Sequence, residues 1–147
     1  MGIHEPYFHA RLDHETILDM VSHLRKLKDE FDTIVVTGVS GQFYGPVLAF
    51  TLGVNYCVVR KPNDGSHDYH PIVGVVGDKW IFLDDFISSG ATRRRVISVM
   101  RDVEPASTYV GTFEYSAREW SPADKHYASV PKESMCGYAA CTLCNPL

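Results

Sequence analysis

The stretch WIFLDDFISSGAT, residues 80–92, joins a hydrophobic run, two adjacent carboxylates and a segment of small, hydroxyl-bearing residues. Residues 80–83 are apolar and predict a buried strand, which places Asp84 and Asp85 at its carboxyl end. Ionised carboxylates are rarely buried without partners, so a cation or a hydroxyl-bearing ligand is expected to meet this pair. The stretch therefore predicts a binding site at the end of a strand.

The residues after the acid pair favour the binding of an anion. They precede a predicted helix over residues 93–103 and supply three hydroxyls and a glycine from Ser88, Ser89, Gly90, Ala91 and Thr92. Small side chains leave backbone N–H groups accessible, and the start of a helix carries a partial positive charge. Residues 93–95 are all arginine, and cations in a first helical turn are tolerable when a phosphate lies nearby. Carboxylates beside such a cradle suit a sugar phosphate.

Outside this stretch, helical and extended patterns alternate along the chain. Helices are predicted over residues 14–30, with Asp13 as N-cap, and over 44–52, after a loop at 39–43. Strands are predicted at 33–38, 54–60, 72–76, 79–83 and 108–113, and Gly77-Asp78 is a hairpin signal between the third and fourth. This order predicts an α/β fold with a mostly parallel central sheet flanked by helices. The loops that leave carboxyl ends of strands are expected to converge.

Composition limits the classes of function. The chain has 147 residues, the size of a single domain, and a formal net charge of −4, which argues against general binding to nucleic acid or to anionic membranes. No run of 18 apolar residues occurs, and the N-terminal residues lack the apolar core of a signal peptide. We therefore expect a soluble, cytoplasmic protein.

Residues 80–92 resemble the signature of the type I phosphoribosyltransferases, enzymes that use 5-phosphoribosyl-1-diphosphate (PRPP). The shared pattern is four apolar residues, two acids, two apolar residues, two small residues and Gly-x-Thr, with a departure at Phe86, where smaller aliphatics are usual. By this resemblance Asp84 and Asp85 bind the ribose 2- and 3-hydroxyls, and residues 88–92 bind the 5-phosphate. The resemblance covers roughly residues 33–113. It implies one domain over residues 1–147, with a core at about 13–113 and a small variable hood at about 114–147.

Two further segments are similar to the family's diphosphate-binding parts. Residues 37–46, TGVSGQFYGP, resemble a loop that often holds a non-proline cis peptide, whose place here would be residues 39–41. Residues 60–62 resemble a turn whose lysine reaches the diphosphate. The residues so implied in diphosphate binding are Val39, Ser40, Gly41, Arg60 and Lys61. The arginine that the family often has in the first loop is missing, and Gln42 stands nearby instead.

The resemblance implies a Mg²⁺-dependent pentosyltransferase that moves ribose 5-phosphate from PRPP to a nucleobase and releases diphosphate. Asp84, Asp85 and Lys61 are then the catalytic residues, Mg²⁺ is held through PRPP near the acid pair, and the loop at 62–70 closes as a lid. Members that use 6-oxopurines usually carry Asp at the place of Ser88, whereas adenine and orotate members carry small residues there. The Arg-Lys-Pro turn at 60–62 and the Gly-Pro-x-Leu-Ala run at 45–49 then favour an adenine-like base in purine salvage. Relatives are commonly homodimers, which makes a homodimer the default expectation.

Several alternatives remain open from the sequence. A non-catalytic PRPP- or nucleotide-binding regulator of the same fold is one. A sugar-phosphate or diphosphate hydrolase that activates a metal-bound water with the His and Asp residues at 64–70 is another. The aromatic residues Tyr115, Trp120, Tyr127 and Tyr138 either form a stacking wall for a base or simply pack. The spacing of Cys136, Cys141 and Cys144, with His126 or Asp124 upstream, allows a zinc site or free thiols.

Overall fold

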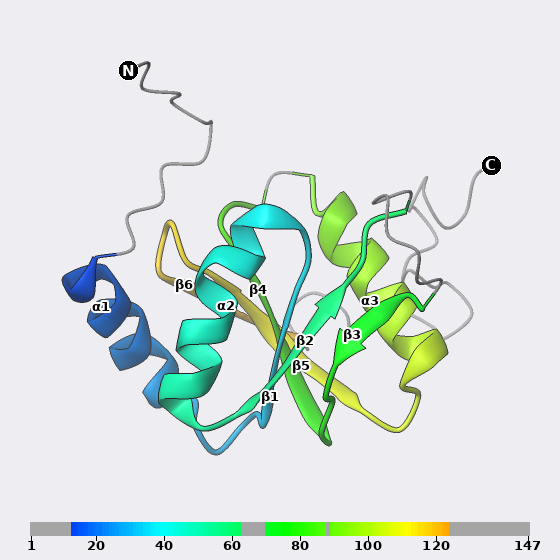
Figure 1. Ribbon diagram of the computed structural model, residues 1–147, viewed down its shortest axis with the longest axis horizontal. Helices are drawn as coiled ribbons and strands as arrows, with labels where there is room; N and C mark the ends of the chain where they lie inside the picture. Colours follow the sequence, from blue (N-terminus) through cyan, green and yellow to red (C-terminus); the bar gives the residue numbers. More distant parts are fainter. Residues whose placement is uncertain (1–12, 63–69, 88, 124–147) are drawn as a thin grey trace.

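The computed structural model describes residues 13–62, 70–87 and 89–123. The helices are α1 His14–Arg25, α2 Gly38–Leu52 and α3 Ala91–Val103, and the strands are β1 Thr33–Val36, β2 Asn55–Val59, β3 Ile72–Gly74, β4 Lys79–Asp84, β5 Thr108–Glu114 and β6 Glu119–Pro122. They form one sheet of order β3-β2-β1-β4-β5-β6 (Figure 1). Strands β2, β1, β4 and β5 run parallel, and the edge strands β3 and β6 are antiparallel to their neighbours. The predicted α/β fold with a mostly parallel sheet is therefore confirmed.

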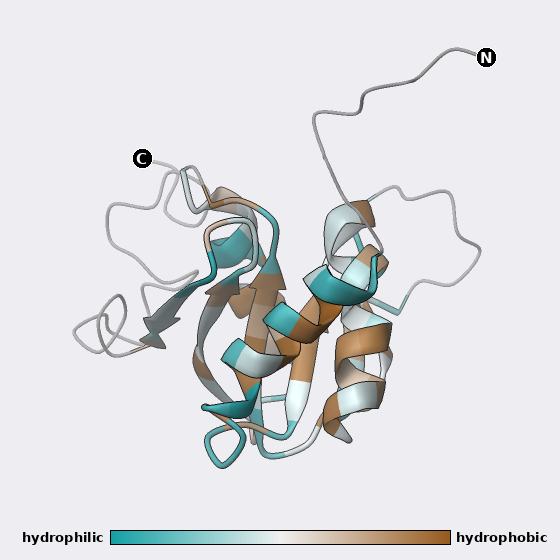
Figure 2. Ribbon diagram, turned by 90° about the vertical axis from the view of Figure 1, so that its left-hand side faces the viewer, coloured by the Kyte–Doolittle hydropathy of each residue, from teal (hydrophilic) through white to brown (hydrophobic). Residues whose placement is uncertain are grey.

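Helices cover both faces of the sheet. Helices α1 and α2 lie against one face and α3 lies against the other (Figure 1). Each face has its own hydrophobic core: Leu24 and Leu48 pack with Ile34 on the first, and Val96 and Met100 pack with Phe82 on the second. In Figure 2 the hydrophobic colour gathers on the central strands and on the helices beside them. Burial on both faces explains why β1 and β4 are continuous apolar runs rather than alternating ones.

Helix α1 begins where the sequence predicts and ends earlier. The Asp13 carboxylate accepts hydrogen bonds from the backbone N of Thr16 at 2.8 Å and from its hydroxyl at 3.0 Å, which caps the first turn. The helix ends at Arg25 instead of residue 30, and residues 26–30 continue as turns.

The predicted hairpin at Gly77-Asp78 is wrong. Strand β3 pairs with β2, and β4 pairs in parallel with β1, so no ladder joins β3 to β4. The segment between them is held by Asp32, whose Oδ2 accepts hydrogen bonds from the backbone N of Asp78 and of Lys79. Strand β4 is buried throughout after its first residue, which requires a neighbouring strand on each side. It therefore lies in the middle of the sheet between β1 and β5, and not next to the short edge strand β3.

The predicted loop at 39–43 is also wrong, because α2 starts directly at Gly38. Gly38 has a left-handed backbone (φ 68°), which turns the chain straight from β1 into the helix. No cis peptide occurs among the described residues, so the expectation of one at 39–41 is not met. Strand β6 was not predicted, and it places residues 119–122 of the expected hood in the sheet.

The order of the strands creates a switch point between β1 and β4. From β1 the chain crosses to β2 through α2 on one face, and from β4 it crosses to β5 through α3 on the other. The carboxyl ends of both strands lie at the upper edge in Figure 1, together with the starts of α2 and α3. Open α/β sheets bind ligands at such an edge. Within the described part of the chain, no helix has the length and hydropathy needed to span a membrane.

Candidate functional site

Two adjacent carboxylates lie at the end of β4. Asp84 is only 7% exposed, and its Oδ1 accepts hydrogen bonds from the backbone N of Asp85 at 2.9 Å and from Ser40 Oγ at 3.3 Å. Asp85 is half-buried beside it. Burial above all, together with the hydrogen bond and the charge of Asp85, raises the pKa of Asp84 to about 7, against the opposing hydrogen bonds from the Asp85 backbone and Ser40. Asp84 therefore exchanges a proton near neutral pH.

The first turn of α2 is pressed against the ends of β1 and β4. A Cβ placed on Gly41 would lie 2.6 Å from the Cβ of Val36 and 3.4 Å from the carbonyl oxygen of Leu83, so only glycine allows this approach. The approach brings Ser40 next to Asp84. At the N-cap of α2, Thr37 makes no side-chain hydrogen bond to the first turn. The start of α2 thus faces the acid pair with its positive end.

Lys61, which follows β2, lies over the start of α2. A Cβ placed on Gly38 would lie 3.0 Å from Cε and 3.1 Å from Nζ of this lysine. The ammonium group of Lys61 and the start of α2 at Gly38 are both positive. Their close approach forms a first cationic corner, where an anion is stabilised. The segments after β1 and β2 therefore meet, as predicted.

The segment between the acid pair and α3 ends in a second cationic corner. Gly90 has a left-handed backbone (φ 77°) at the start of α3, and the Ser89 hydroxyl accepts a hydrogen bond from the backbone N of Ala91 at 3.2 Å. A Cβ on Gly90 would lie 3.3 Å from Nη2 of Arg93 and 3.2 Å from Nη1 of Arg94, so both guanidinium groups gather there. Thr92 is exposed in the first turn, and Ser88 lies outside the described residues.

The side chain of Arg95 does not join those of Arg93 and Arg94 but reaches the segments next to the first cationic corner, formed by Gly38 and Lys61. Its Nη2 donates to Thr37 Oγ1 at 2.8 Å and its Nη1 donates to the carbonyl oxygen of Arg60 at 3.0 Å. The Thr37 hydroxyl in turn donates to the carbonyl oxygen of Val59 at 2.6 Å. The sequence indicated only three consecutive cations, and nothing in their spacing separates the third from the others.

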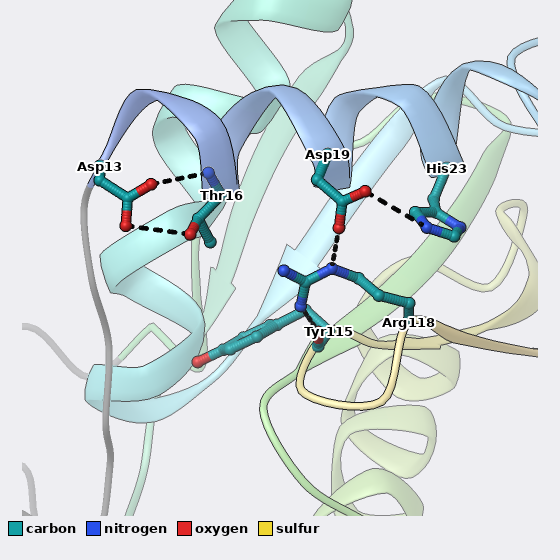
Figure 3. A network of polar contacts seen from close by, with 6 residues as sticks. All are labelled: Asp13, Thr16, Asp19, His23, Tyr115 and Arg118. Carbon is teal, nitrogen blue, oxygen red and sulfur yellow. Dashed lines mark hydrogen bonds and ion pairs between the residues drawn. The ribbon is translucent and has the colours of Figure 1, made fainter.

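Tyr115 holds the backbone of two site residues, Ser40 and Asp84, in place. Its hydroxyl donates to the carbonyl oxygen of Ser40 at 3.0 Å, and its backbone N donates to the carbonyl oxygen of Asp84. Figure 3 shows Arg118 between Tyr115 and α1, where its Nε donates to Asp19 Oδ2 at 2.6 Å. Tyr115 is buried and packs edge-on against Tyr44, so it is a supporting residue and not part of an exposed stacking wall.

The structure brings together part of the predicted site. Asp84 is in contact with Asp85 and Ser40. Lys61 lies against Gly38. Ala91 and Thr92 begin α3 at the same edge of the sheet. Val39 is 76% exposed on α2, while Arg60 donates from Nη1 to the carbonyl oxygen of His70. Trp120 packs on the core. Several predicted residues lie outside the described residues: His67, Asp68, Asp124, His126, Tyr127, Cys136, Tyr138, Cys141 and Cys144.

Comparison with known proteins shows which folds resemble that of this chain. No family model matches the chain. It is 25% identical over 105 residues to the adenine phosphoribosyltransferase of Geobacter metallireducens, a match that covers 60% of this chain and 61% of the relative. The chain thus spans about three fifths of the length of that relative.

Solved structures share the fold at lower identity. An adenine phosphoribosyltransferase from Saccharomyces cerevisiae, complexed with an imino-altritol bisphosphate and adenine, superposes with a TM-score of 0.54 at 18% identity over 68% of this chain and 67% of that one. The orotate phosphoribosyltransferase of Aeropyrum pernix gives 0.55 at 17% identity over 67% and 56%. The predicted resemblance to the type I phosphoribosyltransferases is confirmed, and the fold is theirs.

Proposed function

We propose that this chain, which has the type I phosphoribosyltransferase fold, transfers ribose 5-phosphate from PRPP to a nucleobase and releases diphosphate. The observation that carries the proposal is the meeting of the acid pair with the start of α2, through the contact of Ser40 with Asp84. Lys61 and the starts of α2 and α3 add positive charge at the same edge. PRPP carries two ribose hydroxyls between the 5-phosphate and the diphosphate. This arrangement matches an acid pair that lies between two positively charged helix starts.

In the proposed reaction a ring nitrogen of the base attacks C1 of PRPP. The N–C1 bond forms, the bond between C1 and the diphosphate oxygen breaks, and diphosphate leaves with the electron pair. The proton that the ring of the base loses passes to the leaving diphosphate or to water. Asp84 and Asp85 accept hydrogen bonds from the ribose hydroxyls and face the positive charge that develops on the sugar. Lys61 and the amides at the start of α2 stabilise the negative charge that grows on the leaving diphosphate. Residues 89–92 hold the 5-phosphate and so fix the sugar for attack.

The acid pair also suits Mg²⁺. Carboxylate oxygens are the ligands that Mg²⁺ prefers, and the ion usually keeps water and substrate oxygens in its remaining positions. Among the described residues, no group of three or more His, Cys, Asp or Glu side chains is arranged to hold a metal. We therefore propose that Mg²⁺ enters with PRPP and contacts the protein near Asp84 and Asp85. There it would neutralise charge on the diphosphate.

An adenine-like base in purine salvage is the finer part of the proposal. Ser88 stands where 6-oxopurine enzymes usually carry Asp, and the sequence relative is an adenine phosphoribosyltransferase. Phe86 follows the acid pair and is 65% exposed, which makes an aromatic face available to a base. A homodimer and a location in the cytoplasm are proposed from the same resemblance.

A regulator that binds PRPP without catalysis is the second candidate. Gln42 replaces the arginine that the family often carries, and its amide donates to the carbonyl oxygen of Gly38 instead of adding a positive charge. Less positive charge at the corner formed by Gly38 and Lys61, the diphosphate corner of the proposed site, favours PRPP binding with slow or absent transfer. Residues 63–69 of the loop at 62–70, which is the expected lid, lie outside the described residues.

A diphosphate-release assay separates the two candidates. Purified protein is mixed with PRPP and Mg²⁺, and adenine, guanine, hypoxanthine and orotate are added one at a time while released diphosphate is followed. The enzyme releases diphosphate with adenine, and Lys61→Ala slows this by at least about tenfold because the positive charge that stabilises the leaving diphosphate is lost. The matched control Lys26→Ala, exposed after α1, keeps the wild-type rate. Binding of PRPP without release for any base identifies the regulator.

A further inference from the structure

Arg95 connects α3 to the two segments that would hold the diphosphate. It sits in the first turns of α3, three residues after Thr92, yet its guanidinium leaves the Gly90 corner where Arg93 and Arg94 gather. Its two Nη atoms divide between the end of β1 and the end of β2. We propose that Arg95 is a positioning residue that sets the spacing of the diphosphate corner, an inference that rests on the proposed function.

The contacts of Arg95 fall one residue before each part of that corner. Thr37, which accepts from Nη2, directly precedes Gly38, and Arg60, whose carbonyl oxygen accepts from Nη1, directly precedes Lys61. Gly38 and Lys61 are the residues whose close approach forms the corner. Arg95 therefore fixes the backbone from which both of them project.

A hydroxyl bridge strengthens this arrangement. Thr37 Oγ1 accepts from Arg95 and donates to the carbonyl oxygen of Val59, so the ends of β1 and β2 are joined both directly and through the guanidinium. Thr37 is buried and Arg95 is half-buried, which makes these hydrogen bonds stronger than exposed ones. Burial also lowers the pKa of Arg95 without an opposing carboxylate in the described contacts.

Only arginine has the geometry for this task. Its planar guanidinium directs two donors at two separate acceptors at once, whereas the ammonium of lysine is a single point of charge. Arg95→Lys thus keeps the positive charge and removes the bridge. The ribose 5-phosphate corner is built by residues 89–94 and depends on Arg95 much less. The two corners can therefore be tested separately.

The test measures the binding of two fragments of PRPP by calorimetry, each in Mg²⁺ buffer. Arg95→Lys and Arg95→Gln are both expected to weaken diphosphate binding by about tenfold or more, by analogy with the loss seen when groups that orient metal ligands are replaced. Ribose 5-phosphate binding is expected to change by less than about threefold, because its corner keeps all its contacts. Arg101→Lys, the same substitution in the last turn of α3, is the matched control and keeps wild-type affinity for both fragments.

Thr37→Val tests the bridge from its other side. It should weaken diphosphate binding as Arg95→Lys does, and the double variant should be no worse than either single one because both break the same bridge. Wild-type diphosphate affinity in Arg95→Lys would show that charge alone matters and would overturn the inference. Equal loss of both fragments would show a general loss of structure and would also overturn it. If the wild-type protein binds neither PRPP nor diphosphate, the proposed function itself fails.

Discussion

At the scale of single residues, the carboxyl group of Asp84 lies at the end of a buried strand and is almost wholly shielded from water. It keeps two hydrogen-bond donors, Ser40 Oγ and the backbone N of Asp85, and it also faces the neighbouring carboxylate. Folding therefore favours its neutral form, whereas binding of ribose hydroxyls requires the charged form. A ligand that donates hydrogen bonds to the pair removes this conflict.

The raised pKa of Asp84 predicts a pH-dependent stability. The folded pKa is about 7 against an ordinary value of 3.8, so the folded state holds a proton that the unfolded chain has lost. The resulting stabilisation is complete below about pH 4 and is lost as pH rises to 7. Asp84→Asn has no charge to bury, so the mutant should gain roughly 2 kcal/mol on the wild type between pH 5 and pH 8.

Denaturant unfolding at the two pH values measures this gain. Asp102→Asn, an exposed position on α3, serves as control and should differ from the wild type by the same amount at both pH values. A constant difference for Asp84→Asn as well would show that Asp84 is already charged at pH 5.

Gly41 predicts a linked loss of stability and of binding. In Gly41→Ala the new methyl group would lie 2.6 Å from the Cβ of Val36, so α2 must move away from β1. We expect a cost of about 1–3 kcal/mol in unfolding free energy, as for other overpacked cores, and weaker PRPP binding because Ser40 leaves Asp84. Phe50→Ala, at an 89% exposed position near the other end of the same helix, should leave both unchanged in denaturation and calorimetry. Unchanged PRPP affinity in Gly41→Ala would separate the helix position from the site.

At the scale of elements, Tyr115 ties the end of β5 to the first turn of α2. Tyr115→Phe keeps the ring that packs on Tyr44 and removes only the hydroxyl that donates to Ser40. The change should cost about 1 kcal/mol of stability, the usual contribution of one hydrogen bond, and should weaken PRPP binding several-fold. Tyr109→Phe also removes a bonded hydroxyl, on the face of α3, and should affect stability alone in the same two assays. Equal PRPP affinities in the two variants would contradict a supporting role for Tyr115.

The elements also show where prediction from sequence succeeds. The strand predicted at 79–83 and the helix predicted at 93–103 are found as β4 and α3, because apolar runs and helical periodicity reflect burial and can be seen in the local sequence. The partner of β3 does not, because a three-residue edge strand can pair with either neighbour and its choice depends on Asp32 holding the turn at 78–79. The early start of α2 depends on a glycine contact with β1 that no local pattern contains.

At the scale of the whole molecule, the sheet predicts a gradient of local stability. Strands β1 and β4 lie in the middle of the sheet, with helices on both faces, and β3 and β6 form its edges. Amide hydrogen exchange should be slowest in β1 and β4 and faster by orders of magnitude in the edge strands, since edges open without global unfolding. Addition of PRPP should slow exchange at residues 38–41 and 84–92 in particular. Uniform slowing across the sheet would indicate general stabilisation without a local site.

The candidate site divides in the same way between what sequence predicts and what it does not. Asp84, Asp85 and the small residues after them follow from the chemistry of one short stretch. Arg95 and Tyr115 do not, because their partners Thr37 and Ser40 are 58 and 75 residues away and meet them only in the folded sheet. Residues that contact a ligand carry a chemical pattern, whereas residues that orient them carry only a position in space.

The central claim is that Asp84 and Asp85 form the ribose end of a PRPP site, and calorimetric titration with PRPP and Mg²⁺ tests it most directly. The wild-type protein should bind PRPP saturably, with affinity that falls below about pH 7 as Asp84 becomes protonated. Asp84→Asn/Asp85→Asn should lose at least about tenfold in affinity, since two charged acceptors for the ribose hydroxyls are gone. Binding that is equally tight in this double variant, or absent in the wild type, would contradict the account.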